Sequence, residues 1–155
     1  MVKFKTLIIL TFSLLVISFQ SCQKENDGEN ETKISAAGTS RSHNAGRNCM
    51  DCHSQGGSGD GWFTVAGTAY NSAKTNIYPN VTVKLYTAIN GTGTLKYTIM
   101  GDAEGNFYTT EAIDFGTGLY PTVQGSAAPK YMASAITTGK CNSCHGVTTE
   151  KLWTN

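Results

Sequence analysis

The chain has 155 residues, the size of one compact domain or of one domain with extended ends. Charged residues make up 15% and hydrophobic residues 39% of the composition, which excludes a highly charged disordered chain and favours a globular β protein. Twelve basic side chains against eleven acidic ones leave a net charge of +1, so we expect no nucleic-acid partner, because a phosphate backbone is held by a basic surface.

Residues 1–21 have the pattern of an export signal. Lys3 and Lys5 form a short cationic head, and residues 7–19 form an apolar stretch of 13 residues. A stretch of this length is too short to span a bilayer as a helix of the mature protein. We therefore expect residues 1–21 to be a signal peptide.

Cys22, the first of five cysteines, directly follows this signal. The sequence Phe19-Gln20-Ser21-Cys22 resembles the cleavage box of bacterial lipoproteins, and the resemblance implies that Cys22 carries the lipid. Gln23, and not Asp, follows Cys22, and acidic residues come after it at Glu25, Asp27, Glu29 and Glu31. This resembles an outer-membrane lipoprotein, which implies a lipid-anchored protein that faces the periplasm or the cell surface. The alternative is an ordinary secreted protein with Cys22 as a stray thiol. Residues 22–40 are polar without apolar periodicity, which predicts a flexible tether with a reach of about 25 Å.

The other four cysteines lie in two Cys-x-x-Cys-His motifs, at 49–53 and 141–145. This is the attachment motif for c-type haem, in which two cysteines form thioethers and the following histidine is the proximal ligand of the iron. The alternatives are a redox-active cysteine pair, a zinc site and plain disulfides. Two copies behind an export signal favour two covalently attached haems, in segments 41–61 and 125–155. The residues expected to bind them are Cys49, Cys52, His53, Cys141, Cys144 and His145.

Distal ligands are scarce, because the chain has only three histidines. His43 is the spare imidazole, six residues before the first motif, and we expect it to bind one of the two irons. For the other iron we favour Met132, since His/Met ligation is a standard arrangement in cytochromes. Lys130 and Lys140 are less common alternatives. The spacing leaves open which haem each distal ligand serves.

The region between the motifs, residues 62–124, has the pattern of a β-sandwich. Apolar and polar residues alternate in 63–70, 81–86 and 95–99, which predicts strands with one buried face. Turn residues cluster at 90–93 and 101–106, at hairpin positions.

Three runs in this region carry a resemblance to a known fold: Val65–Thr68, Val81–Leu85 and Asp102–Phe107. They resemble the carboxypeptidase-regulatory-like, transthyretin-like β-sandwich. This implies a mainly β, Ig-like sandwich flanked by two short haem-binding segments. The alternating oxygens of Asp102, Glu104 and Asn106 could also suit calcium, but the run lacks the length of an EF-hand loop, and we expect turn chemistry there.

Taken together, the chain resembles an extracytoplasmic dihaem c-type cytochrome. The resemblance implies electron transfer between redox partner proteins, without transformation of a substrate. One alternative is a haem enzyme or small-molecule sensor with an open iron position. The other is a surface binding module that carries haem. The sequence does not identify the partners.

Overall fold

The structure is a computed structural model that describes residues 29–155. The expected signal peptide and Cys22 lie outside these residues. Within the described part of the chain no helix has the length and apolar character needed to cross a membrane.

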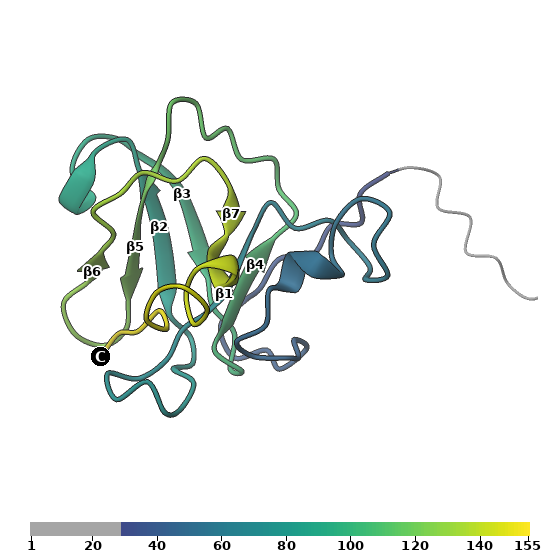
Figure 1. Cartoon of the computed structure of the whole chain (residues 1–155), viewed down its shortest axis with the longest axis horizontal. Coiled ribbons are helices and arrows are strands. Elements are labelled where there is room, and N and C mark those ends of the chain that lie inside the picture. The colour runs from purple at the N-terminus through teal and green to yellow at the C-terminus, as the bar shows by residue number, and fades with distance from the viewer. Residues whose placement is uncertain (1–28) are drawn as a thin grey trace, which may run out of the picture.

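The chain forms two facing β-sheets (Figure 1), which confirms the expected mainly β sandwich. The first sheet has the order β4-β1-β7, with strands Asn106–Thr109, Val65–Thr68 and Gly139–Lys140. The second has the order β3-β2-β5-β6, with strands Leu95–Met100, Thr82–Tyr86, Tyr120–Gln124 and Lys130–Tyr131. All neighbouring strands are antiparallel except β1 and β7, which are parallel. Three short 3-10 turns complete the structure: η2 (Cys49–Asp51), η3 (Ile89–Gly91) and η4 (Cys141–Ser143).

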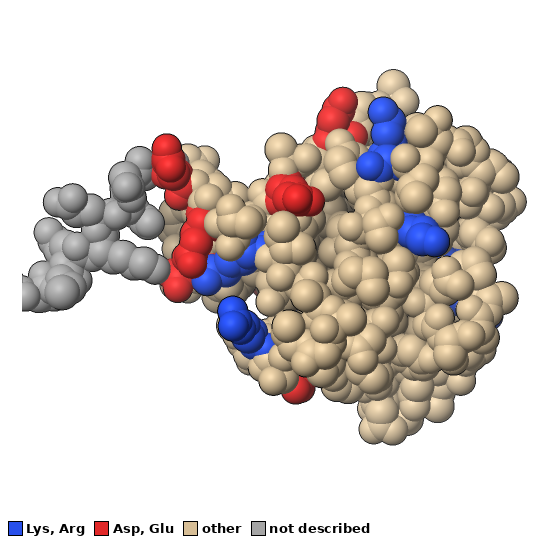
Figure 2. Space-filling model, turned by 180° about the vertical axis from the view of Figure 1, so that it is seen from behind, with Lys and Arg blue, Asp and Glu red and all other residues tan. Residues whose placement is uncertain are grey.

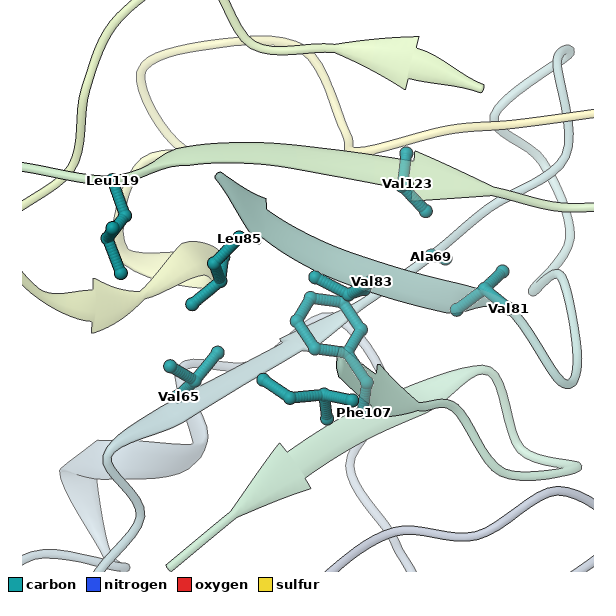
Figure 3. Close-up of a cluster of buried hydrophobic side chains, with 9 residues drawn as sticks. Val65, Ala69, Val81, Val83, Leu85, Phe107, Leu119 and Val123 are labelled. Atoms are coloured by element: carbon teal, nitrogen blue, oxygen red, sulfur yellow. The ribbon is translucent and has the colours of Figure 1, made fainter. Parts of the chain in front are cut away.

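Apolar side chains from both sheets form one core between them (Figure 3). In β2 the buried residues are Val83 and Leu85, while their neighbours in the strand are half-exposed, as the alternation predicted. Val65 of β1 and Phe107 of β4 belong to the same cluster from the other sheet. Burial of side chains of this kind stabilises the fold by about 1.5–3 kcal/mol each.

Strand β1 differs from the prediction, because all four of its residues are buried. A strand with one buried face was expected here. One face of β1 belongs to the sandwich core, and the turn η4 packs against the strand as well. The residues that bury the second face of β1 therefore lie more than seventy positions further along the chain, and the local alternation of apolar and polar residues does not predict them.

The expected turn at 101–106 is present and is closed by an antiparallel bridge between Gly101 and Phe107. Strands β3 and β4 on either side of it belong to different sheets, so the turn also connects the two sheets. The turn chemistry itself is as expected. One carboxylate oxygen of Asp102, Oδ1, accepts the backbone N–H groups of Glu104 and Asn106 at 3.0 Å each. This arrangement closes the turn in the manner typical of Asp.

The second half of the predicted tether is part of the fold. Ser35 is buried, its N–H donates to the carbonyl of Tyr108 and its hydroxyl donates to the carbonyl of Met100. Ile34 forms a β-bridge with Thr109. This stretch covers the open edge of β4 and satisfies its backbone groups, so the prediction of a free tether to residue 40 is wrong for this segment.

The boundary predicted at residue 125 is also wrong in structural terms. The segment 125–155 supplies β6 to one sheet and β7 to the other. Its last residues return to the chain just after β1, where Tyr70 forms a bridge with Trp153 and the N–H of Thr154 donates to the carbonyl of Tyr70. The second Cys-x-x-Cys-His motif is thus embedded in the sandwich.

Two leucines that differ in burial provide a test of the core. Leu119 is 3% exposed within the cluster, whereas Leu95 is 44% exposed at the edge strand β3. Leu119→Ala should lower the free energy of unfolding by about 2–5 kcal/mol, because it opens a cavity in the core. Leu95→Ala should change it by about 0.5 kcal/mol or less. Denaturant unfolding of both variants measures this, and equal losses would contradict the described core.

Candidate haem-binding sites

The two Cys-x-x-Cys-His motifs adopt the same local structure. In the first, the carbonyl of Cys49 accepts the N–H groups of Cys52 at 3.3 Å and His53 at 2.9 Å. In the second, the carbonyl of Cys141 accepts the N–H groups of the corresponding cysteine and histidine at 3.3 and 3.0 Å. The tight turn brings both cysteines and the histidine of each motif close together. Two separate segments therefore present the same set of groups.

Both motif histidines have one ring nitrogen fixed by the backbone. Nδ1 of His53 lies 2.8 Å from the carbonyl oxygen of Asp60, and Nδ1 of His145 lies 2.9 Å from the carbonyl oxygen of Glu150. Because a carbonyl oxygen only accepts, each contact is a hydrogen bond when Nδ1 carries the proton, and in the neutral ring this leaves the lone pair of Nε2 free for a metal. Metal-binding histidines are typically held in this way by a second partner.

Two further contacts orient the ring of His53. It stacks on Phe63, with ring centroids 4.3 Å apart, and Phe63 in turn stacks on Tyr108 at 4.8 Å. Gly59 lets the backbone pass close to the imidazole, since a Cβ there would lie 2.7 Å from Nδ1. The imidazole is therefore oriented before any metal binds.

The first motif opens on a cavity of about 540 Å³, called the first cavity here, which Cys49, Cys52 and His53 line together with His43. The volume is in the range of small-molecule and cofactor sites. The ring centroids of His43 and His53 are 5.9 Å apart. Two metal–nitrogen bonds of about 2 Å, with about 1 Å from each nitrogen to its ring centre, span about 6 Å. The spacing of the two ring centres thus matches that of two imidazoles on one metal atom, and the rings are tilted by 42° to each other.

The second motif opens on a second cavity, of about 390 Å³, which Cys141, His145 and Met132 line. The core residues Leu85 and Phe107 form part of its wall. The structure therefore brings His43 together with the first motif and Met132 together with the second. The sequence named both residues but not this pairing.

Basic side chains line the first cavity: Lys33, Arg41 and Arg47. These include both arginines of the chain. The acidic residues Asp51 and Asp60 lie at the same cavity. Arginine binds carboxylates with two parallel hydrogen bonds, so this wall suits a cofactor that carries carboxylates, as haem does through its propionates.

Lysines also line the second cavity. Lys130 and Lys151 contribute to its wall together with Glu150 and Trp153, and Nζ of Lys130 lies 4.3 Å from the centre of the Trp153 ring. On the face drawn in Figure 2 charged side chains are few and of both signs.

The four motif cysteines are free thiols that differ in exposure. Cys52 and Cys144 are exposed. Desolvation raises the pKa of the Cys49 thiol, and burial raises the pKa of the Cys141 thiol from 9.0 to about 12. Each motif therefore has one partly buried and one exposed cysteine.

Within residues 29–155 no group of three or more His, Cys, Asp or Glu side chains is arranged to hold a bare metal ion. The donors at each cavity instead match those of a haem iron: one oriented imidazole and one further side chain, His43 or Met132.

Sequence reasoning missed three buried polar residues that connect the sites: Thr68, Asn106 and Asn142. The motif definition treats position 142 as variable, and no local pattern marks it. Comparisons with protein-family models, curated proteins and solved structures found no match. The resemblances described above therefore depend on the residues quoted for them.

The unequal burial of the thiols predicts unequal alkylation in chain produced without haem. Iodoacetamide at pH 8 should label Cys52 and Cys144 first, because these two cysteines are exposed to the reagent. The raised pKa of Cys141 should slow its labelling roughly a thousandfold. Peptide mass spectrometry measures each rate, and denatured chain, in which all four should react alike, is the control. Rapid labelling of Cys141 in native buffer would contradict its burial.

The same burial predicts how this haem-free fold responds to alkaline pH. Below pH 9.0 the thiol of Cys141 is protonated in both folded and unfolded chain and adds no pH dependence. Between pH 9.0 and about 12 the unfolded chain loses this proton first, so stability falls as the pH rises.

Proposed function

We propose that the protein is an electron carrier, a dihaem c-type cytochrome anchored to the outer membrane through Cys22. One haem would be attached to Cys49 and Cys52 and the other to Cys141 and Cys144. The observation that carries this proposal is that each motif histidine, held at Nδ1, lines a cavity that also contains one further iron-binding side chain.

The distal ligands follow from the two cavities. His43 would complete a bis-histidine site with His53, and Met132 would complete a histidine–methionine site with His145. The bound iron supplies a one-electron couple whose potential depends on its axial ligands. With both axial positions taken by side chains, neither site has a position for substrate. This favours electron transfer over an enzyme or sensor.

The arrangement of the sites also supports transfer within one chain. Both motifs pack against β1, and the side chain of Asn142 in the second motif donates to the carbonyl of Arg47, two residues before the first motif. Electrons would pass between the haems and then to partner proteins. The partners are redox proteins at the membrane surface.

The pairing of ligands predicts that each distal variant acts on one iron. Met132→Ala should remove the charge-transfer band of a methionine-bound ferric haem at the red edge of the spectrum and shift the higher midpoint potential, on the order of 100 mV. His43→Ala should leave that band in place and perturb the lower-potential haem. Met100→Ala is the matched control, because Met100 lies outside both cavities. An unchanged band and unchanged midpoints in Met132→Ala would contradict this ligand.

The function itself predicts two low-spin haems that do not bind carbon monoxide in the reduced parent protein. Met132→Ala should bind carbon monoxide at one haem per chain, since it opens one coordination position. Absorption spectra with and without the gas measure this. Ready binding by the parent protein would contradict the electron carrier and favour the haem enzyme or sensor.

A further inference from the structure

A buried amide connects the two haem motifs. Nδ2 of Asn142 donates to the carbonyl of Arg47 at 2.9 Å and to Oγ1 of Thr68 at 3.0 Å. Oδ1 of Asn142 accepts the N–H of Thr68 at 3.1 Å. One side chain thus binds the second motif, strand β1 and the segment before the first motif.

The network continues from Thr68 to the loop that carries His43. Oγ1 of Thr68 accepts the N–H of Gly46 at 2.8 Å and donates to Oδ1 of Asn106 at 2.6 Å. Nδ2 of Asn106 donates to Oγ of Ser42 at 2.9 Å and to the carbonyl of His43 at 3.4 Å. Each side-chain N–H of both asparagines has a partner, and the threonine hydroxyl donates once and accepts twice.

These three side chains, Thr68, Asn106 and Asn142, are called the connecting network here. Each is at most 3% exposed. Hydrogen bonds shielded from water are strong and directional, and a fully satisfied network favours one arrangement of its parts. The parts joined here are the two cofactor segments, so the network restricts how one motif can move relative to the other.

Close packing against β1 also restricts the movement of the second motif. Gly67 precedes Thr68, and a Cβ at this position would lie 2.8 Å from Cβ of Cys141. The second motif therefore lies directly against the strand that the network uses. Its first cysteine, an expected haem attachment point, has little room to shift.

We propose that Thr68, Asn106 and Asn142 are positioning residues that set the separation and orientation of the two haems, and through them the electronic interaction between the haems. This inference rests on the proposed function, because it requires a haem at each motif. Thr68 and Asn142 line neither cavity and neither is an expected haem ligand, so their removal should change the relation between the haems and leave the ligation of each iron intact. Asn106 lines the first cavity and is therefore not varied in the test.

The test uses the full chain with both haems attached and measures circular dichroism in the Soret band. Two neighbouring haems give a paired signal of opposite signs, whose amplitude depends on their separation and relative orientation. Asn142→Ala and Thr68→Val should each reduce this amplitude, on the order of twofold, because a site without its supporting hydrogen bonds loosens by about 1 Å. The absorption spectra of the ligated irons should stay unchanged.

Two controls separate positioning from general stability. Thr68→Ser keeps the hydroxyl, so it should keep the parent signal. Leu119 belongs to the core but lines neither cavity, so Leu119→Ala should also keep the parent signal despite its lower stability. Thr68→Val nearly preserves volume and provides a folded variant if Asn142→Ala fails to accumulate.

The outcomes distinguish the two proposals. A parent protein without two haems contradicts the proposed function, and the positioning role with it. A parent with two haems but no paired signal contradicts the positioning role alone. An unchanged paired signal in Thr68→Val would also contradict the positioning role. A reduction in Leu119→Ala as large as that in Thr68→Val would contradict it as well.

Discussion

The contact between Thr68 and Asn142 is the interaction on which the relation of the two sites depends. This contact forms because β7 lies parallel to β1 and ends at Lys140, directly before Cys141. The second motif therefore lies against β1, the middle strand of its sheet. The small residue Gly67 allows the close approach. A side chain at this position would push the motif outward and break the hydrogen bonds beside it.

Local features of the chain were predictable from the sequence, whereas contacts between distant segments were not. Strand β2 and the two motifs were predictable, because alternation and motif spacing are local features. The two-sided burial of β1 was not, since its cover comes from residues distant in the chain. The pairing of His43 with the first cavity and Met132 with the second likewise depends on chain path, which spacing does not encode. Ser35 was misread because a polar residue bound to an edge strand looks like part of a polar linker.

The two sites share one local design in different surroundings. In both sites a backbone carbonyl holds Nδ1 of the motif histidine, so the folded backbone sets the orientation of the imidazole. Both arginines line the first cavity, whereas the wall of the second includes core residues such as Leu85 and Phe107. Axial ligands and surrounding polarity are the main means by which a protein adjusts haem potential. The difference between the two walls would therefore give the two proposed haems different potentials.

The mass of the intact, mature protein shows whether each motif attaches a haem. We expect a single species heavier than the processed polypeptide by two haems, with the added mass retained after denaturation. Peptide mapping should place one haem on residues 49–53 and the other on residues 141–145. A chain without added haem that contains zinc or disulfides at these cysteines would rule out haem attachment.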